Sequence, residues 1–406
     1  MIERTEYLQR LLSWKDEMVI KVVTGLRRCG KSTLLKQYQN LLLNSGVDDT
    51  QIISINFEEL ENEPLLDYKA LYQYIKDRLC QNKTTYIFLD EIQKVPSYEK
   101  VVDSLYVKPG VDIYISGSNA YMLSSDLATL LSGRYVELSM LPLSFREYCQ
   151  ATKLKDESAF ADYMKYGGLP YLAVMEKTEE KAEVYLEGIY NTVIVKDIAE
   201  RQDRRESEMA RRKITDISLL KNIAKFLAGS VGSPISVRSI TDYLVSNGRK
   251  VSTNTISDYV LALSESFVFY PAERYDIVGK QILKSNKKWY IVDMGLRNHI
   301  LPRRNYDLGF TIENIVFLEL LRREYTVYIG KYETTEIDFV ARKHGIYTYF
   351  QVTADMTSEA TFEREMRPLR KVKDNYEKIV LTLDRFTVGN YDGIKVINVI
   401  DWLLNS

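Results

Sequence analysis

The sequence is poor in cysteine and histidine, on which disulfide frameworks and many metal or catalytic sites depend. Its 406 residues include three cysteines and two histidines. Because the cysteines are odd in number and far apart along the chain, they argue against both a disulfide framework and a zinc site. Two histidines, His299 and His344, nearly exclude histidine-based triads and His-rich metal sites. A reducing, cytoplasmic location is therefore expected.

Long apolar runs and an excess of one charge are also missing. No apolar stretch approaches the length of a membrane span, and the first residues lack the apolar core of a secretory signal. The formal net charge is −1, so any nucleic-acid binding must come from local patches. We expect no membrane association.

The residues that are present describe a folded chain with large cores. Hydrophobic residues make up 45% and aromatic residues 11%, with 30 tyrosines. The length suggests two or three domains. We find no internal repeat and no low-complexity segment.

The most informative stretch is a complete G-x-x-x-x-G-K-[S/T] motif over residues 25–32. Gly25 and Gly30 allow backbone angles and a close approach that a Cβ would forbid. Lys31 places a cation on the β- and γ-phosphates, and the Ser32 hydroxyl ligates Mg²⁺. The apolar run Val19–Val23 before the motif predicts a buried strand, and a helical pattern follows it. The stretch therefore predicts a site for ATP or GTP.

The residues of this loop and the first turn after it are the candidate nucleotide-binding residues. They are Gly25, Arg27, Arg28, Cys29, Gly30, Lys31, Ser32 and Thr33. The two arginines have two interpretations, as phosphate contacts or as partners of a nearby Asp or Glu.

A second motif ends the apolar run Tyr86–Leu89 with two carboxylates. Asp90 would hold the metal beside Ser32, and Glu91 would act as general base on the attacking water. The strand-like segment Gln51–Asn56 lies between the two motifs. It suggests an additional sheet strand between them, as in ATPases that carry the catalytic glutamate.

Two later positions have roles that the sequence leaves open. The predicted strand that ends at Ser116 is followed by Ser118 and Asn119, either of which could sense the γ-phosphate, although the same residues suit a simple turn. Arg134 could act on a neighbour's nucleotide in a homo-oligomer. A structural salt bridge explains Arg134 equally well.

The pattern of elements divides the chain into four sections. Residues 1–150 alternate strands and helices, which predicts an α/β fold with a parallel sheet covered by helices on both faces. Residues 151–213 are helical and charged, with a break at Tyr166–Pro170. Residues 214–300, two helices and a hairpin, suggest a winged helix. Residues 301–406 are expected to form a separate small α/β unit. The expected strands of the first section are Val19–Val23, Gln51–Asn56, Thr85–Leu89, Asp112–Ser116 and Tyr135–Leu138.

The winged-helix section carries basic residues that could contact duplex DNA. They lie at the start of the second helix and in the hairpin: Arg249, Lys250, Lys280, Lys284, Lys287 and Lys288. Cations at these positions suit phosphate contacts, but the second helix has few groups for reading bases. A module that packs against an unknown protein partner is the alternative.

Several motifs together resemble a prokaryotic AAA+ ATPase family, its archaeal-ATPase-like branch. The resemblance rests on the loop at 25–32, Leu89-Asp90-Glu91-Ile92-Gln93, Gly117-Ser118-Asn119, Gly133-Arg134, Leu141–Glu147 and Tyr166–Pro170. It implies a AAA+ core, a helical lid, a winged helix and a restriction-endonuclease-like C-terminal domain. The choice of ATP over GTP rests on this resemblance.

Nuclease domains of that type need two acids and a lysine around Mg²⁺. The sequence offers Glu313 or Glu319 and Asp338, but the next strand has Gln351 and Thr353 where an acid and a lysine should stand. We therefore expect a degenerate domain without cleavage activity.

These patterns predict an ATPase that uses Mg²⁺ and couples its nucleotide state to a conformational change. The catalytic candidates are Lys31, Glu91, Ser118, Asn119 and Arg134, and the metal ligands are Ser32 and Asp90. The alternatives are an ATP-switched DNA-binding regulator and an ATP-gated nuclease.

Overall fold

A computed structural model describes residues 2–118, 133–154, 156–176, 178–193, 198, 214–301 and 308–405. The chain divides into two units. The N-terminal unit comprises Met1–Pro142 with Glu265–Phe267, and the C-terminal unit comprises Leu143–Ser264 with Val268–Ser406. The expected linker at 201–213 lies outside the described residues.

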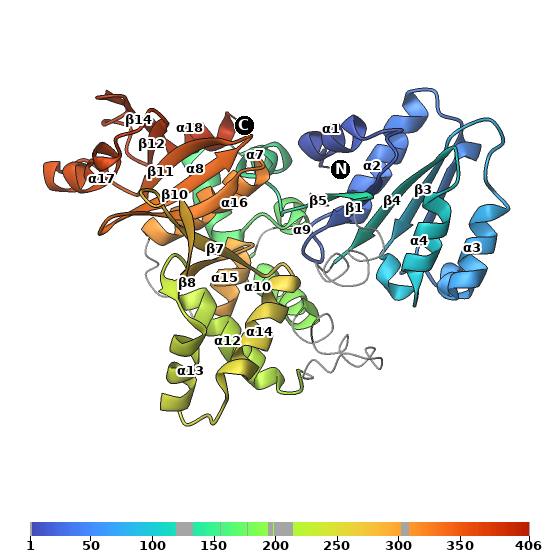
Figure 1. Cartoon of the computed structure of the whole chain (residues 1–406), viewed down its shortest axis with the longest axis horizontal. Helices are drawn as coiled ribbons and strands as arrows, with labels where there is room; N and C mark the ends of the chain where they lie inside the picture. Colours follow the sequence, from blue (N-terminus) through green and yellow to red (C-terminus); the bar gives the residue numbers. More distant parts are fainter. Residues whose placement is uncertain are drawn as a thin grey trace. The chain divides into compact units, whose positions relative to one another are not determined.

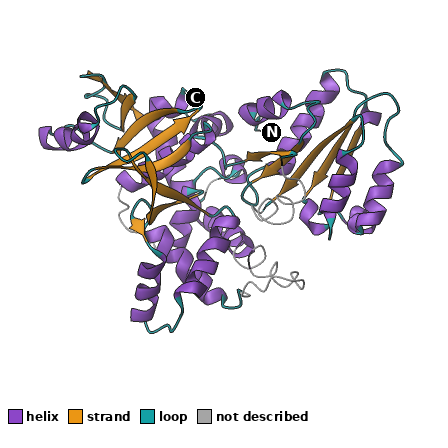
Figure 2. Cartoon of the chain, viewed as in Figure 1, coloured by secondary structure: helices purple, strands orange, loops and turns teal. Residues whose placement is uncertain are grey.

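The N-terminal unit is built on a five-stranded sheet in which every pairing is parallel (Figures 1 and 2). The strand order is β2-β3-β4-β1-β5. The predicted parallel α/β sheet is confirmed. The strands are β1 (Ile20–Thr24), β2 (Ile52–Asn56), β3 (Thr85–Asp90), β4 (Val111–Gly117) and β5 (Tyr135–Ser139).

One detail of the expected sheet order is wrong. The strand between β1 and β3 is β4, whereas β2 lies at the edge. The burial of the two strands explains the difference, because six of the seven residues of β4 are buried while β2 alternates and exposes Ser54. A strand buried on both faces belongs inside a sheet, and the polar residue in β2 suits an edge.

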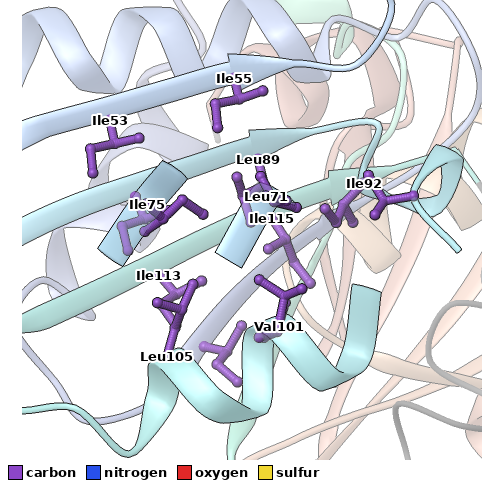
Figure 3. Packing of buried hydrophobic residues seen from close by; sticks show 14 of the residues in the cluster. Ile53, Ile55, Leu71, Ile75, Leu89, Ile92, Val101, Leu105, Ile113 and Ile115 are labelled. Atoms are coloured by element: carbon purple, nitrogen blue, oxygen red, sulfur yellow. The ribbon is translucent and has the colours of Figure 1, made fainter. Parts of the chain in front are cut away.

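Helices cover both faces of this sheet. On one face, α3 and α4 pack Ile75 and Leu105 against β4 residues such as Ile113 (Figure 3). Since neighbouring residues of a strand point to opposite faces, Tyr114 lies on the other face, where it contacts Tyr38 of α2. The helices and 3₁₀ turns are α1 (Thr5–Ser13), α2 (Lys31–Asn44), η1 (Asp49–Gln51), η2 (Leu60–Leu66), α3 (Tyr68–Lys76), η3 (Ile92–Lys94) and α4 (Tyr98–Tyr106).

The C-terminal unit contains one sheet of nine strands, in the order β13-β14-β12-β11-β10-β9-β7-β8-β6. Strand β7 pairs in parallel with β9, and the register runs from Glu273 opposite Tyr328 to Asp276 opposite Lys331. The strands are β6 (Pro234–Ile235), β7 (Phe269–Asp276), β8 (Gln281–Ile291), β9 (Thr326–Tyr332), β10 (Thr335–Lys343), β11 (Ile346–Thr353), β12 (Glu377–Thr382), β13 (Gly389–Tyr391) and β14 (Ile394–Asn398).

This sheet shows that residues 301–406 do not form a separate unit as expected. Its strands come from both 214–300 and 301–406, so the two sections share backbone hydrogen bonds. The winged-helix and endonuclease-like assignments, and the four section boundaries, stay predictions.

The helices of this unit include the expected break. Helix α8 ends at Tyr166 and α9 begins at Pro170. The helices are α7 (Phe145–Thr152), α8 (Asp156–Tyr166), α9 (Pro170–Val174), α10 (Glu179–Asn191), α12 (Ile217–Gly229), α13 (Val237–Ser246), α14 (Thr253–Glu265), α15 (Met294–Ile300), α16 (Leu308–Arg322), α17 (Glu359–Lys371) and α18 (Val399–Leu404). Within the described residues, none of the helices has the length and apolar character needed to cross a membrane.

Candidate nucleotide site

The glycine-rich loop joins β1 to α2, as its sequence predicts. Gly25 has a φ of 142°, and a Cβ there would lie 2.2 Å from the carbonyl oxygen of Met140. Gly30 has a φ of 107° and directly precedes the first turn of α2. Both positions therefore require glycine, the first for close approach and both for backbone angle. The loop presents the start of a helix, where unpaired N–H groups and the helix dipole favour an anion.

Lys31 is buried at the centre of this loop. Its Nζ donates to the carbonyl oxygens of Gly25 at 3.1 Å and Leu26 at 3.3 Å. The same Nζ lies 3.7 Å from Oε1 of Glu91. The ammonium thus connects the loop to the carboxylate motif at the end of β3.

Asp90 is the last residue of β3, and it lies beside the loop. Its carboxylate accepts a hydrogen bond from the Ser116 hydroxyl, and the Ser32 hydroxyl lies close enough to favour its charged form. Burial raises the pKa of Asp90, while the two serine hydroxyls and the charge of Lys31 oppose that rise. The two predicted metal ligands are therefore adjacent in space.

Glu91 follows Asp90 in a left-handed conformation, with a φ of 54°. Its carboxylate accepts a hydrogen bond from the Gln93 amide and a longer one, 3.4 Å, from the Ser118 hydroxyl. Its backbone N–H donates to the Ser116 oxygen at 3.1 Å. In the described part of the chain, the buried Oε1 of Gln93 has no hydrogen-bond partner.

Ser116 and Gln93 are site residues to which the sequence gave no role, although Gln93 belongs to one of the motifs that carry the family resemblance. The available signals were weak. Ser116 is a polar residue at the end of an apolar strand, and Gln93 stands two residues after the carboxylate pair. Neither position has a fixed spacing to the glycine-rich loop.

The remaining candidate residues differ in their contacts and burial. Arg27 pairs with Glu58 at 2.9 Å, and Arg134 pairs with Asp103 at 2.7 Å. Each pair is the structural alternative that the sequence left open. Arg28 and Thr33 are exposed, Cys29 is buried, and Asn119 lies outside the described residues. Burial raises the pKa of the Cys29 thiol, which makes it a poor nucleophile.

The donor set at this edge of the sheet fits a magnesium nucleotide. The Ser32 hydroxyl and the Asp90 carboxylate are oxygen ligands of the kind that Mg²⁺ prefers. Lys31 and the start of α2 supply positive charge for phosphates. Glu91 supplies a carboxylate next to both.

A second polar cluster lies in the C-terminal unit, around Glu313. Lys288 of β8 is 3.2 Å from Glu313 and 2.9 Å from Glu336, and the Tyr290 hydroxyl donates to Glu313 at 2.6 Å. Burial opposes the charged form of Lys288, but the carboxylates of Glu313, Asp338 and Glu336 outweigh it and raise the Lys288 pKa. This cation was not expected here, since Lys288 precedes Glu313 by 25 residues and was assigned to the wing.

Of the other residues considered for an endonuclease-like site, Asp338 lies near this cluster, whereas Gln351 and Glu319 have other partners. Burial and the Glu313 charge raise the pKa of Asp338, whose carboxylate accepts from the Val352 N–H at 2.8 Å. Gln351 donates to Glu365 at 3.0 Å. Glu319 instead pairs with two arginines, Arg322 and Arg323. Across the described ranges, no group of three or more His, Cys, Asp or Glu side chains could hold a metal ion.

Three of the six expected DNA-contacting cations are buried or paired with an acid, whereas Lys250 and Lys280 are exposed. Lys288 is buried, so its assignment to a phosphate-binding surface is wrong. Arg249 pairs with Asp216 and Lys287 with Glu273, both at 2.9 Å. The side chain of Lys284 lies outside the description.

Comparisons with known proteins agree with the geometry of the nucleotide site. An AAA domain matches residues 17–149, and a domain of unknown function matches residues 157–307. An uncharacterized protein of Haemophilus influenzae is 41% identical over 410 residues, covering 100% of this chain and 99% of that protein. An uncharacterized protein of Methanocaldococcus jannaschii is 29% identical over 378 residues, covering 87% of this chain and 79% of that one.

Among solved structures, a Walker-type ATPase of Pyrococcus abyssi has a similar fold. The TM-score is 0.50 at 16% identity, and the match covers 74% of this chain and 96% of that one. At this identity the likeness concerns the fold alone.

Proposed function

Because the chain belongs to the same family as the Haemophilus influenzae protein and carries an AAA domain, we propose that it binds ATP with Mg²⁺ and hydrolyses it. In this proposal the change of nucleotide state drives a conformational change. ATP is favoured over GTP by the AAA domain and by the absence of an N-K-x-D-like guanine-reading motif in the sequence.

One observation carries the proposal, the convergence of the loop and the two carboxylates. Lys31 Nζ lies 3.7 Å from Glu91, and the Ser32 hydroxyl lies beside the Asp90 carboxylate. Two sequence motifs about 60 residues apart would meet in this way if they served one magnesium triphosphate.

Each residue then has a defined task. Lys31 exchanges its carbonyl contacts for phosphate oxygens, and Ser32 with Asp90 holds Mg²⁺, which neutralises phosphate charge when bound. Glu91 takes the proton of the attacking water. The unpartnered Oε1 of Gln93 lies next to Glu91 and is available to accept a hydrogen bond from that water. Ser118 or Asn119 senses the γ-phosphate.

The test separates binding from turnover. Lys31→Ala is expected to abolish ATP binding, because the loop loses its phosphate-binding cation. Glu91→Gln is expected to keep binding and to lower kcat by about 10²- to 10⁴-fold, the usual contribution of a general base. Isothermal titration and a phosphate-release assay measure the two effects.

Lys36→Ala is the matched control, since Lys36 is an exposed lysine of the same helix. A Glu91→Gln variant that hydrolyses ATP at the wild-type rate would show that the base is wrongly assigned. If Arg134 leaves Asp103 to act on the nucleotide of a neighbouring copy, specific activity is expected to rise steeply with protein concentration.

One observation favours a nuclease as second candidate. Lys288 brings to Glu313 and Asp338 the cation that the β11 strand lacks. Its ammonium is, however, already held by Glu313 and Glu336. We therefore expect no Mg²⁺-dependent nicking of plasmid DNA, and nicking that disappears in Asp338→Ala would establish the nuclease instead.

A further inference from the structure

Arg4 directly precedes α1, 25 residues before Cys29 of the glycine-rich loop, and its guanidinium lies against that loop. The side chain is buried, with 3% of its surface exposed. Nη1 donates to the Cys29 carbonyl at 3.1 Å. Nη2 donates to the carbonyls of Leu141 at 2.8 Å and Pro142 at 3.4 Å. One planar group therefore binds two segments of chain, the loop and the residues that follow β5.

The segment after β5 is also hydrogen-bonded to the end of β1 and to α1. The Met140 N–H donates to the Thr24 carbonyl at 2.7 Å, and the Leu141 N–H donates to the Tyr7 hydroxyl at 3.1 Å. The guanidinium carbon of Arg4 lies 4.9 Å from the centre of the Tyr7 ring. Residues 140–142 thus pack against the first residue of the loop, Gly25, and Arg4 links them to Cys29 later in the loop.

The bond to Cys29 bears on phosphate binding through the geometry of the peptide unit. A trans peptide is planar, and its C=O and N–H point in opposite directions. The described residues contain no cis peptide. When Arg4 holds the Cys29 carbonyl on one side, the Gly30 N–H must point to the other. That N–H is one of the loop donors expected to bind the β-phosphate.

We propose that Arg4 is a positioning residue for nucleotide binding, which holds the Cys29–Gly30 peptide so that its N–H faces the phosphates. This inference rests on the proposed function. Lysine cannot replace arginine here, because a single ammonium on a flexible stem lacks the fork that reaches both segments at once. The carbonyls of Leu141 and Pro142 hold one side of the guanidinium while the other side binds Cys29.

The experiment compares Arg4→Lys and Arg4→Ala with Arg10→Ala in the full chain. Arg10 is the matched control. Its guanidinium carbon lies 5.4 Å from the centre of the same Tyr7 ring, but it belongs to the last turn of α1. ATP affinity, KM, kcat and the melting midpoint with and without ATP are measured. Arg4→Lys is expected to raise the KM and Kd for ATP about 10- to 100-fold, as for a lost buried charge-assisted bond. We expect kcat at saturation to change less.

Arg10→Ala is expected to bind ATP like the wild type. The proposal is overturned if Arg4→Lys binds ATP with wild-type affinity, or if Arg10→Ala weakens binding as much. If Arg4→Ala does not fold, Arg4→Lys alone tests the proposal. The proposal is then contradicted if ATP raises the melting midpoint of Arg4→Lys as far as that of the wild type. Lys31→Ala separates the two hypotheses: if it still binds ATP, the proposed function fails, whereas loss of binding there with normal binding in Arg4→Lys refutes only the role of Arg4.

Discussion

Ser116 shows how a single hydroxyl connects the parts of the candidate site. It donates to the Asp90 carboxylate and accepts from the Glu91 N–H at 3.1 Å. Burial raises the pKa of Asp90, so the donor from Ser116 helps to keep that carboxylate charged. The same oxygen fixes the backbone at Glu91, which adopts a left-handed conformation. Ser116 therefore orients both acids without being an acid or a base itself.

Ser116→Ala is expected to reduce Mg²⁺-dependent turnover by about tenfold or more, because it removes a buried hydrogen bond to a charged group. ATP binding in the absence of Mg²⁺ should change little. The measurement is the ATPase rate as a function of Mg²⁺ concentration.

Ser54→Ala is a suitable comparison, since Ser54 is an exposed serine on the edge strand of the same sheet. If Ser116→Ala needs no more Mg²⁺ than the wild type and turns over equally fast, Ser116 has no part in orienting the acids.

At the scale of elements, the break between α8 and α9 is a packing point. Gly167 has a φ of 78°, and a Cβ on Gly168 would lie 2.5 Å from the Leu143 carbonyl oxygen. The Asp293 carboxylate accepts from the N–H groups of Gly168 at 2.6 Å and Leu296 at 2.9 Å. Burial raises the pKa of Asp293 to about 6, although these backbone donors favour its charged form. Gly167 lets the chain approach Asp293 at the start of α15, and Gly168 lets it approach the Leu143 backbone.

Gly168→Ala is expected to destabilise the chain by about 1–3 kcal/mol, because the added methyl group must displace backbone. Gly188→Ala should be neutral or stabilising by up to about 1 kcal/mol, since Gly188 lies within α10 and a Cβ there meets nothing within 4 Å. Urea unfolding of both variants measures the difference. Equal midpoints would mean that the approach at Gly168 is not tight.

For the C-terminal unit as a whole, Lys288 and the β7–β9 pairing join stretches of sequence that looked independent. Lys288 belongs to β8, and its partners Glu313 and Glu336 belong to α16 and β10. The ion pairs and the shared sheet both cross residue 300. We therefore expect residues 214–301 and 308–405 to unfold as one cooperative body.

Lys288→Met is expected to cost about 3–5 kcal/mol, because it leaves the buried Glu313 without its cation. Lys287→Ala on the same strand should cost at most about 1 kcal/mol, since its pair with Glu273 is exposed to solvent. Chemical denaturation followed by circular dichroism measures both. A Lys288→Met variant as stable as Lys287→Ala would show that the cluster contributes little to folding.

The parallel sheet and the position of the glycine-rich loop between β1 and α2 were predictable from the sequence alone. This was possible because these features depend on neighbouring residues, on the apolar period of a strand and on the backbone angles of Gly25 and Gly30. The carboxylate pair was visible for the same reason, since Asp90 and Glu91 end an uninterrupted apolar run.

The side chains that join these local features from distant parts of the sequence could be identified only from the folded chain. Arg4 reaches a carbonyl 137 residues away, Ser116 lies beside Asp90 because β4 is inserted between β1 and β3, and Lys288 is buried among acids of other elements. Such partners have no fixed spacing in the sequence, because the order of strands in a sheet is set by the packing of the whole chain rather than by any one segment.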